Sequence, residues 1–224
     1  DFSCRNIVMN VRSIESKIIY KGLEYIFFCP VTGSFNLSNA IAAIAASVSM
    51  GVNIQNAISC MKTFKGTPGR LELVREDVDN GAIFIDYAHT PDAFDNVLST
   101  MKMVGGGRKI ITIFGCGGDR DRSKRPKMAI IAEKYSSEVI ATSDNPRNEN
   151  LDSILSDIES GFILNKYKII KNRKEAIEFG LSKMNNDTIL LILGKGRENY
   201  QLVNGKKNYH NDIEIINTFY ENRN

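Results

Sequence analysis

The sequence lacks several features that would each assign it to a class of proteins. No apolar run among its 224 residues approaches the roughly 18 residues that a bilayer-spanning helix needs. The four cysteines form no CxxC pair and have no metal-ligand spacing. Basic residues outnumber acidic residues only by 29 to 26, too small an excess to indicate nucleic-acid binding. We therefore expect reduced cysteines and neither a membrane nor a nucleic-acid partner.

Two nucleotide-binding motifs and a targeting signal are also missing. The chain contains neither a GxGxxG fingerprint nor a GxxxxGKS/T phosphate-binding loop, so if ATP is used, something else must hold its β and γ phosphates. Residues 1–10, DFSCRNIVMN, lack the basic and then apolar regions of a signal peptide, and we expect a cytoplasmic protein. Because this segment starts without Met inside an expected strand, we also expect a fragment of a longer protein.

The first 68 residues show strand patterns and then helix patterns. Residues 5–30 are typical of strands. A helical period then places four apolar side chains on one face, namely Leu37, Ile41, Ile44 and Val48. Gly51 ends that helix, and 54–64 is a second one. The segment KGTPGR, residues 65–70, is typical of a junction between domains.

From residue 70 onwards, strand and helix patterns alternate. Strands are predicted at 82–88, 109–115, 138–144, 167–171 and 187–194, and helices at 91–103, 124–136, 151–162, 173–184 and 212–222. Strict alternation predicts a parallel sheet with helices on both faces. We therefore predict an α/β fold with a Rossmann-like, doubly wound, mostly parallel sheet.

Polar clusters follow four of the five predicted strands. They are DYAHTPD (86–92), GCGGDRDRSKRP (115–126), SDNPRNEN (143–150) and GKGRENY (194–200). In doubly wound sheets, ligands bind beyond the carboxyl ends of the strands. We therefore expect a functional site at this edge of the sheet.

The first two clusters contain residues that helix capping does not explain. Thr90 and Pro91 form a standard helix start, which leaves Asp86 and His89. Asp86 could accept hydrogen bonds from ribose hydroxyls, while for His89 a structural role is equally compatible with the sequence. In the second cluster, glycines let backbone N–H groups approach an anion, and residues 116–127 contain five basic and two acidic side chains. A solvated basic turn is the alternative there.

The third cluster places an arginine directly after a proline at the end of a strand. Pro146 makes the backbone rigid before Arg147, and a guanidinium on a rigid loop suits a carboxylate or phosphate held in one orientation. The alternative is an arginine that neutralises Asp144 or Glu149. Asn150 is expected to cap the helix that follows.

Six motifs in register resemble those of a known family: GSFNLSNAIAA, GTPGRLE, DYAHTPDA, FGCGGDRDRSKRPKMA, SDNPRNEN and GKGRENYQ. They resemble the Mur ligases, and in particular the MurE ligases, which add the third amino acid to the peptidoglycan precursor. The resemblance covers about residues 30–212. It implies that residues 1–68 are the C-terminal part of the central, ATP-binding domain and that residues 69–224 are the C-terminal Rossmann-like domain. The UDP-sugar domain and the phosphate-binding loop would lie outside this chain.

The resemblance implies an ATP-dependent amide ligase. Such ligases join meso-diaminopimelate to UDP-N-acetylmuramoyl-L-alanyl-D-glutamate through an acyl phosphate, and they use ATP and Mg²⁺. The phosphate and metal ligands are expected mainly outside this chain, so we expect it to be inactive alone, and monomeric. One alternative is a stand-alone diamino-acid-binding module without catalysis. Another is a folylpolyglutamate-synthetase-like ligase, in which DNPR and GGDRD would have no role.

The resemblance also implies a role for individual residues, with no metal ligand and no catalytic residue assigned in this chain. Nucleotide contacts are implied for Asn39 (at adenine), Arg70, Asp86 and His89, and diamino-acid contacts for Arg120, Asp144, Asn145, Arg147, Gly194 and Glu198. Arg147 would bind the distal carboxylate of meso-diaminopimelate, which lysine lacks, although lanthionine would satisfy the same contact.

The last motif departs from the family pattern, which usually reads GKGHE. Here Arg197 stands where a histidine is expected. Arginine does not lose its proton near neutral pH. A role that needs a neutral imidazole would therefore be lost, whereas a simple contact with an anion could survive.

Overall fold

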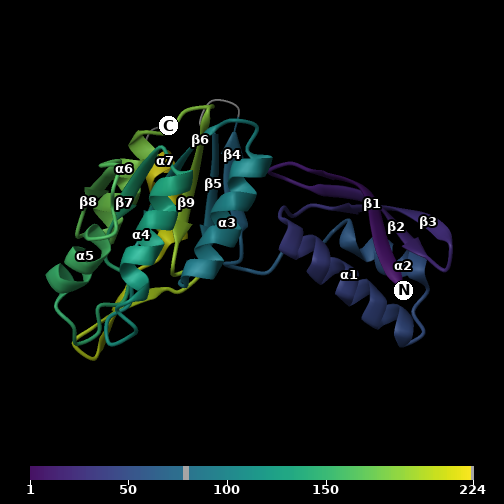
Figure 1. Cartoon of the computed structure of the whole chain (residues 1–224), viewed down its shortest axis with the longest axis horizontal. Helices are drawn as coiled ribbons and strands as arrows, with labels where there is room; N and C mark the ends of the chain where they lie inside the picture. The colour runs from purple at the N-terminus through teal and green to yellow at the C-terminus, as the bar shows by residue number, and fades with distance from the viewer. Residues whose placement is uncertain (78–80, 223–224) are drawn as a thin grey trace. The chain divides into compact units, whose positions relative to one another are not determined.

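The computed structural model describes residues 1–77 and 81–222. The chain divides into two compact units, residues 1–67 with 103–106 and residues 68–102 with 107–224, and Figure 1 labels their elements. In the described ranges, no helix combines the length and the apolar character that crossing a membrane requires.

The first unit contains a three-stranded antiparallel sheet and two helices. Its elements are β1 (Phe2–Met9), β2 (Ile14–Tyr20), β3 (Leu23–Cys29), α1 (Ser34–Ser49) and α2 (Ile54–Met61). Ile14, Ile18 and Phe27 of the sheet pack with Leu37 and Ile44 of α1 in one core. The helical period predicted for this segment is therefore confirmed.

The described residues from 68 onwards form a six-stranded sheet, five helices and a two-stranded hairpin that is described with the site. The strands are β4 (Glu72–Asp77), β5 (Gly81–Asp86), β6 (Lys109–Phe114), β7 (Glu138–Ala141), β8 (Tyr167–Ile169) and β9 (Thr188–Leu193). The helices are α3 (Pro91–Val104), α4 (Lys124–Tyr135), α5 (Leu151–Glu159), α6 (Arg173–Ser182) and α7 (Asp212–Glu221). Each predicted strand and helix of this region is present, with boundaries that differ by a few residues.

The sheet has the strand order β4–β5–β9–β6–β7–β8. β4 is antiparallel to β5, and the other neighbours are parallel. The predicted α/β fold with a mostly parallel sheet is confirmed. The sequence did not reveal β4, because its residues ELVRED are mostly charged and do not alternate, a composition that an edge strand tolerates.

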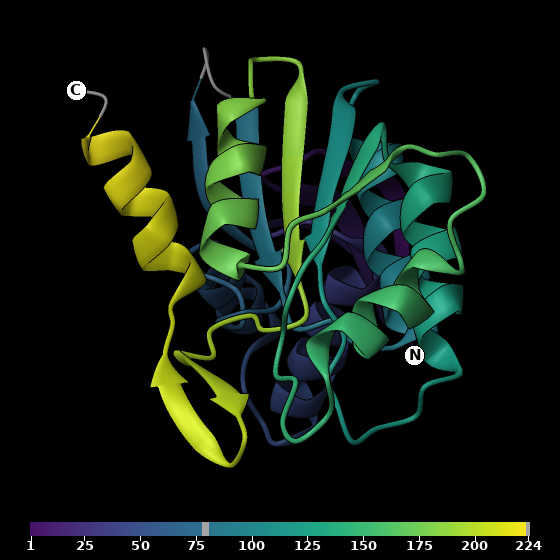
Figure 2. The same cartoon turned by 90° about the vertical axis from the view of Figure 1, so that its left-hand side faces the viewer.

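Helices cover both faces of the sheet (Figure 2). On one face, α6 and α7 contribute Ile177, Leu181 and Ile216 to a core with Ile113 and Ile192 of the central strands. On the other face lie α3, α4 and α5, and the Phe94 ring of α3 meets the Phe114 ring of β6 edge to face. Because both faces are covered, β5 and β9 are buried at every position.

The strand order determines which loops meet. β9 lies between β5 and β6, although it is the last of the parallel strands in the sequence. The segments that follow β5, β6, β7 and β9 therefore leave the same edge of the sheet. That edge carries all four polar clusters of the sequence.

Candidate functional site

A cavity of about 440 Å³ lies at this edge and is lined from all four clusters. It brings together the whole set of residues predicted to bind the diamino acid, Arg120, Asp144, Asn145, Arg147, Gly194 and Glu198, and His89 from the predicted nucleotide set. Asn39, Arg70 and Asp86 do not line it. The cavity thus contains the whole diamino-acid set and one member, His89, of the nucleotide set.

Asp86 is buried, and its carboxylate is used by the protein backbone. One oxygen accepts a hydrogen bond from the Leu71 N–H and the other from the Ala88 N–H, each at 2.5 Å. Burial raises the pKa of Asp86, while these two N–H groups oppose the rise. The carboxylate thus fixes the turn after β5 onto the start of β4, and its contact with ribose stays a prediction.

Arg70 and His89 both contact one tyrosine ring. The Arg70 guanidinium is 4.9 Å from the centroid of the Tyr87 ring, and the His89 ring meets the same ring edge to face at 4.9 Å. His89 Nδ1 also donates to the Tyr87 carbonyl at 2.8 Å. Asn39 is exposed on α1 in the first unit. The nucleotide contacts of these residues stay predictions.

The glycines after β6 allow that loop to pack against the segment after β7. A Cβ on Gly118 would lie 1.9 Å from the Pro146 carbonyl oxygen, which no side chain tolerates. The Gly118 N–H donates to the Asn145 carbonyl at 2.9 Å, and the Asn148 N–H donates to the Asp119 carboxylate at 3.2 Å. The two loops are therefore held together by a backbone hydrogen bond and by the Asp119 carboxylate.

The basic cluster after β6 is used partly inside the protein and partly at the cavity. Arg125 is fully buried and pairs with Glu149 at 2.6 Å and with Asp157 at 2.8 Å. Arg122 is exposed and pairs with Asp157 at 2.9 Å. The Arg125 hydrogen bonds hold the pKa of Glu149 below its usual value. Arg120, by contrast, lines the cavity and makes no hydrogen bond or ion pair within the described ranges.

Arg147 has a left-handed backbone, with φ of 55°, which is unusual for a residue with a side chain. A β-bridge holds it: the Arg147 N–H donates to the Leu202 carbonyl at 2.8 Å, and the Asn204 N–H donates to the Arg147 carbonyl at 2.7 Å. Its Nη1 donates to the Gly118 carbonyl at 2.7 Å. Neither Asp144 nor any other carboxylate of the described residues forms an ion pair with it.

The bridging partner of Arg147 belongs to a hairpin that the sequence analysis missed. β10 (Tyr200–Val203) and β11 (Lys206–Tyr209) are short, and β11 is exposed throughout. Asn204 and Gly205 join them with φ of 48° and 74°, and Asn-Gly is the sequence signal for such a turn. The Gln201 amide donates to Ser143 Oγ and to the Asp144 carbonyl, each at 2.9 Å. The hairpin therefore supports the segment that contains Arg147.

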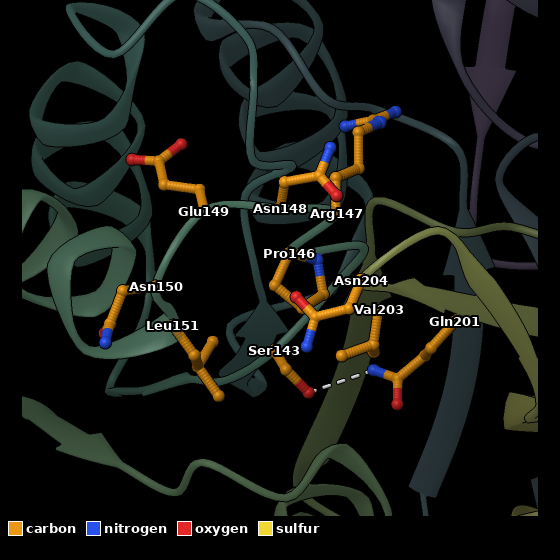
Figure 3. Close-up of a pocket in the computed structure, with 10 residues that line it drawn as sticks. All are labelled: Ser143, Pro146, Arg147, Asn148, Glu149, Asn150, Leu151, Gln201, Val203 and Asn204. Carbon is orange, nitrogen blue, oxygen red and sulfur yellow. Dashed lines mark hydrogen bonds between the residues drawn. The ribbon is translucent and has the colours of Figure 1, made fainter.

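A second cavity of about 520 Å³ shares this segment (Figure 3). Its lining is rich in neutral polar side chains, which are Ser143, Asn148, Asn150, Gln201 and Asn204. Figure 3 shows the Arg147 guanidinium pointing away from Ser143 and Gln201. The charged end of Arg147 is therefore not directed at Ser143 or Gln201, although Arg147 is part of the lining of the second cavity.

The loop after β9 places Glu198 beside Asn145. The Asn145 amide donates to Glu198 Oε2 at 2.9 Å. A Cβ at Gly194, where φ is 108°, would lie 2.7 Å from the Asp144 carboxylate, so only glycine fits there. The sequence analysis did not name Lys195, which is fully buried and donates to Asn145 Oδ1 at 3.2 Å and to Glu198 Oε2 at 3.0 Å.

Arg197 pairs with a carboxylate of the protein itself. Its Nε donates to Glu72 Oε2 at 2.9 Å, and its Nη2 donates to the other oxygen of Glu72. The Gly69 N–H donates to Glu72 Oε2 at 2.7 Å. Arg197 therefore attaches the loop after β9 to the start of β4 and does not line the 440 Å³ cavity.

A buried ion pair lies behind the site and holds the ends of two strands. Arg173 pairs with Asp212 at 2.7 Å and donates to the carbonyls of Ser143 at 3.4 Å and Leu193 at 3.2 Å. Burial alone would raise the pKa of Asp212, but Arg173 and His210 hold it below its usual value. The pair therefore sets the spacing between the ends of β7 and β9, where Asp144 and Gly194 follow.

The arrangement suits a ligand that carries both signs of charge. The guanidinium groups of Arg120 and Arg147 and the carboxylates of Asp144 and Glu198 line one cavity. Lys124 and Asp121 line it too, but Lys124 donates to the His89 carbonyl and Asp121 accepts hydrogen bonds from Ser123. Carboxylates of a ligand would pair with the guanidinium groups of Arg120 and Arg147, and its ammonium groups would pair with the carboxylates of Asp144 and Glu198. No cluster of three or more His, Cys, Asp or Glu side chains suited to a metal ion occurs in the described ranges.

Residues 69–196 match the family described as Mur ligase, glutamate ligase domain, and the chain belongs to the Mur ligase family. It is 40% identical over 215 residues to UDP-N-acetylmuramoyl-L-alanyl-D-glutamate–2,6-diaminopimelate ligase of Bacillus cereus, covering 96% of this chain and 43% of that protein. It is 36% identical over 220 residues to UDP-N-acetylmuramoyl-L-alanyl-D-glutamate–2,6-diaminopimelate ligase 1 of Clostridium acetobutylicum, covering 98% of this chain and 45% of that protein. A solved structure of a ligase of this name has a TM-score of 0.75 and 33% identity, covering 100% of this chain and 46% of that one. The chain thus spans less than half the length of these relatives.

Proposed function

We propose that this chain is part of an ATP-dependent amide ligase of peptidoglycan synthesis. The ligase adds meso-diaminopimelate, or a similar diamino diacid, to UDP-N-acetylmuramoyl-L-alanyl-D-glutamate. On this proposal, residues 69–224 are the C-terminal domain that binds the incoming amino acid, and residues 1–68 are the C-terminal part of the central domain. The names of the two relatives support the proposed reaction, and their greater length supports the proposal that this chain is a fragment of a longer ligase.

The charges that the fold leaves without partners support the substrate. Within the described ranges, the Arg120 and Asp144 side chains form no hydrogen bond or ion pair, and Glu198 uses only Oε2. Meso-diaminopimelate carries a carboxylate and an ammonium group at each end, which matches the guanidinium groups of Arg120 and Arg147 and the carboxylates of Asp144 and Glu198 in one cavity. Lysine has no second carboxylate and would leave one guanidinium without a partner.

Arg147 is proposed to select the substrate. Because Nη1 is already bound to the Gly118 carbonyl, Nε and Nη2 remain as a fork for a carboxylate. A bidentate, charge-assisted pair of this kind discriminates against a ligand without the carboxylate, since the guanidinium is then left desolvated and unpaired. The left-handed backbone held by β10 keeps the fork in one orientation.

ATP would supply the phosphoryl group that activates the carboxylate of the acceptor. In this chain, Arg70 and His89 are exposed and both contact the Tyr87 ring, and they fit a contact with the nucleoside. Asp86 would support that face through the backbone of Leu71 and Ala88. We propose that the phosphates and Mg²⁺ are bound outside this chain. The cytoplasmic location and the monomeric state stay predictions.

Calorimetry with two ligands tests the substrate. We expect the wild-type chain to bind meso-diaminopimelate about 10- to 100-fold more tightly than L-lysine, since a hydrogen bond to a charged group contributes about 1.5–3 kcal/mol. Arg147→Ala should remove this preference. Arg122→Ala is the matched control, because Arg122 pairs with Asp157 outside the cavity. An unchanged preference in Arg147→Ala would contradict the assignment.

Activity assays separate the ligase from a stand-alone binding module. We expect the 224 residues to bind the amino acid without hydrolysing ATP or forming the amide bond. Measurable ligation by this chain alone would overturn the proposal that it is an inactive fragment of a longer ligase. Binding without ligation by the longer protein that contains this chain would favour the binding module.

A further inference from the structure

Lys195 contacts residues that line the cavity. The proposed contacts with the substrate give it no role. Its side chain is fully buried, and it does not line the cavity. The centroid of the Tyr200 ring is 5.6 Å from its ammonium nitrogen. Burying a charge is unfavourable unless the charge is paired and hydrogen-bonded. The partners of this ammonium group therefore indicate what it does.

Those partners are two side chains that do line the cavity. The ammonium group donates to Asn145 Oδ1 at 3.2 Å and to Glu198 Oε2 at 3.0 Å. The Asn145 amide donates to the same Glu198 oxygen at 2.9 Å, so the three side chains form a closed triangle. Asn145 Oδ1 also accepts the Leu202 N–H at 2.8 Å, which fixes the orientation of the amide.

The triangle leaves one carboxylate oxygen for a ligand. Oε2 of Glu198 accepts two hydrogen bonds from within the protein, whereas Oε1 has no partner within the described ranges. A carboxylate held by one oxygen cannot rotate freely, so the other oxygen keeps a fixed position. Such an oxygen suits a ligand ammonium group.

We propose that Lys195 is a positioning residue for the ammonium group of the incoming amino acid. It holds Glu198 by Oε2, together with Asn145, so that Oε1 accepts the hydrogen bond from the ligand. It acts through Glu198 and does not touch the ligand. This inference rests on the proposed function. It adds an explanation of how the ammonium group of the incoming amino acid is oriented.

A double-mutant cycle tests whether Lys195 acts through Glu198. Calorimetry measures the Kd of meso-diaminopimelate for wild type, Lys195→Met, Glu198→Gln and the double variant. We expect each single change to weaken binding about 10-fold, and the double variant to bind within about twofold of Glu198→Gln alone. Losses that multiply to about 100-fold would overturn the proposal, because Lys195 would then act independently of Glu198.

A ligand without amino groups provides a second readout. Pimelate keeps both carboxylates of the substrate and lacks its ammonium groups. Lys195→Met should change the Kd of pimelate by less than about twofold. An equal loss for pimelate and meso-diaminopimelate would show that Lys195 only supports the fold. If Lys195→Met does not fold, as judged by circular dichroism, Lys195→Gln takes its place in the same cycle.

The two proposals fail in different ways. If wild type does not bind meso-diaminopimelate, the proposed function fails. If wild type binds it with the preference that depends on Arg147, but Lys195 and Glu198 are not coupled, only the role of Lys195 is overturned.

Discussion

Two cavities share the segment of residues 143–147, and they differ in the charges that they offer a ligand. The smaller one, of about 440 Å³, contains the carboxylate of Asp144 and a guanidinium, that of Arg120, neither of which has a protein partner in the described ranges. The larger one, of about 520 Å³, is lined mostly by neutral polar side chains. Its charged residues are Glu149, which pairs with Arg125, and Arg147, which lines both cavities. We therefore place the proposed binding site by the charges left without partners and not by cavity size.

The largest effect is expected where the two loops of the smaller cavity touch. Gly118→Ala would place a Cβ 1.9 Å from the Pro146 carbonyl oxygen, and backbone must move to relieve the overlap. We expect a loss of about 1–3 kcal/mol in the free energy of unfolding in urea, together with loss of meso-diaminopimelate binding. Gly107→Ala is the control for binding, since nothing lies within 4 Å of its Cβ; its φ of 88° makes the substitution strained, so it should lose stability but keep binding. Normal binding by Gly118→Ala would contradict the proposed packing.

A smaller effect is expected from loosening the hairpin that supports Arg147. Gln201→Leu removes the amide that donates to Ser143 Oγ and to the Asp144 carbonyl. We expect a loss of about 1–2 kcal/mol in the free energy of unfolding and a roughly threefold smaller preference for meso-diaminopimelate over lysine in calorimetry. Asn208→Ala, opposite Gln201 in the hairpin, is the matched control. An unchanged preference in Gln201→Leu would show that the hairpin does not position Arg147.

The smallest effect is expected from filling the larger cavity. Leu151→Phe adds volume there, and the Kd of meso-diaminopimelate should change by less than about twofold. Gly117→Ala is the matched change in the smaller cavity, because its Cβ would lie 2.7 Å from Arg147 Nη1. It should displace the guanidinium and weaken binding more than Leu151→Phe does. The reverse order of effects would assign the ligand to the larger cavity.

Periodicity and strand ends predicted much of this arrangement from the sequence. Alternating strand and helix patterns give the parallel strands and the helices on both faces. The rule that ligands bind beyond the carboxyl ends of strands then brings Arg120, Arg147 and Glu198, which are far apart in the sequence, to one cavity. The helix caps at Thr90 and Asn150 were also predictable, because capping depends only on residues that are neighbours in the sequence.

What the sequence did not predict depends on pairing between distant residues. Glu72 and Arg197 are 125 positions apart, and no local pattern links them. Lys195 reads as one more cation in a Gly-rich loop, and only the fold shows that it is buried against Asn145 and Glu198. The hairpin of β10 and β11 is different, because Asn204 with Gly205 is a local signal that could have predicted it.

A crystal structure of the chain with meso-diaminopimelate tests the central claim most directly. We predict that the ligand occupies the 440 Å³ cavity, with one carboxylate on Nε and Nη2 of Arg147 and an ammonium group on Glu198 Oε1. A ligand in the 520 Å³ cavity, or one that leaves the Arg147 fork without a carboxylate, would contradict the account.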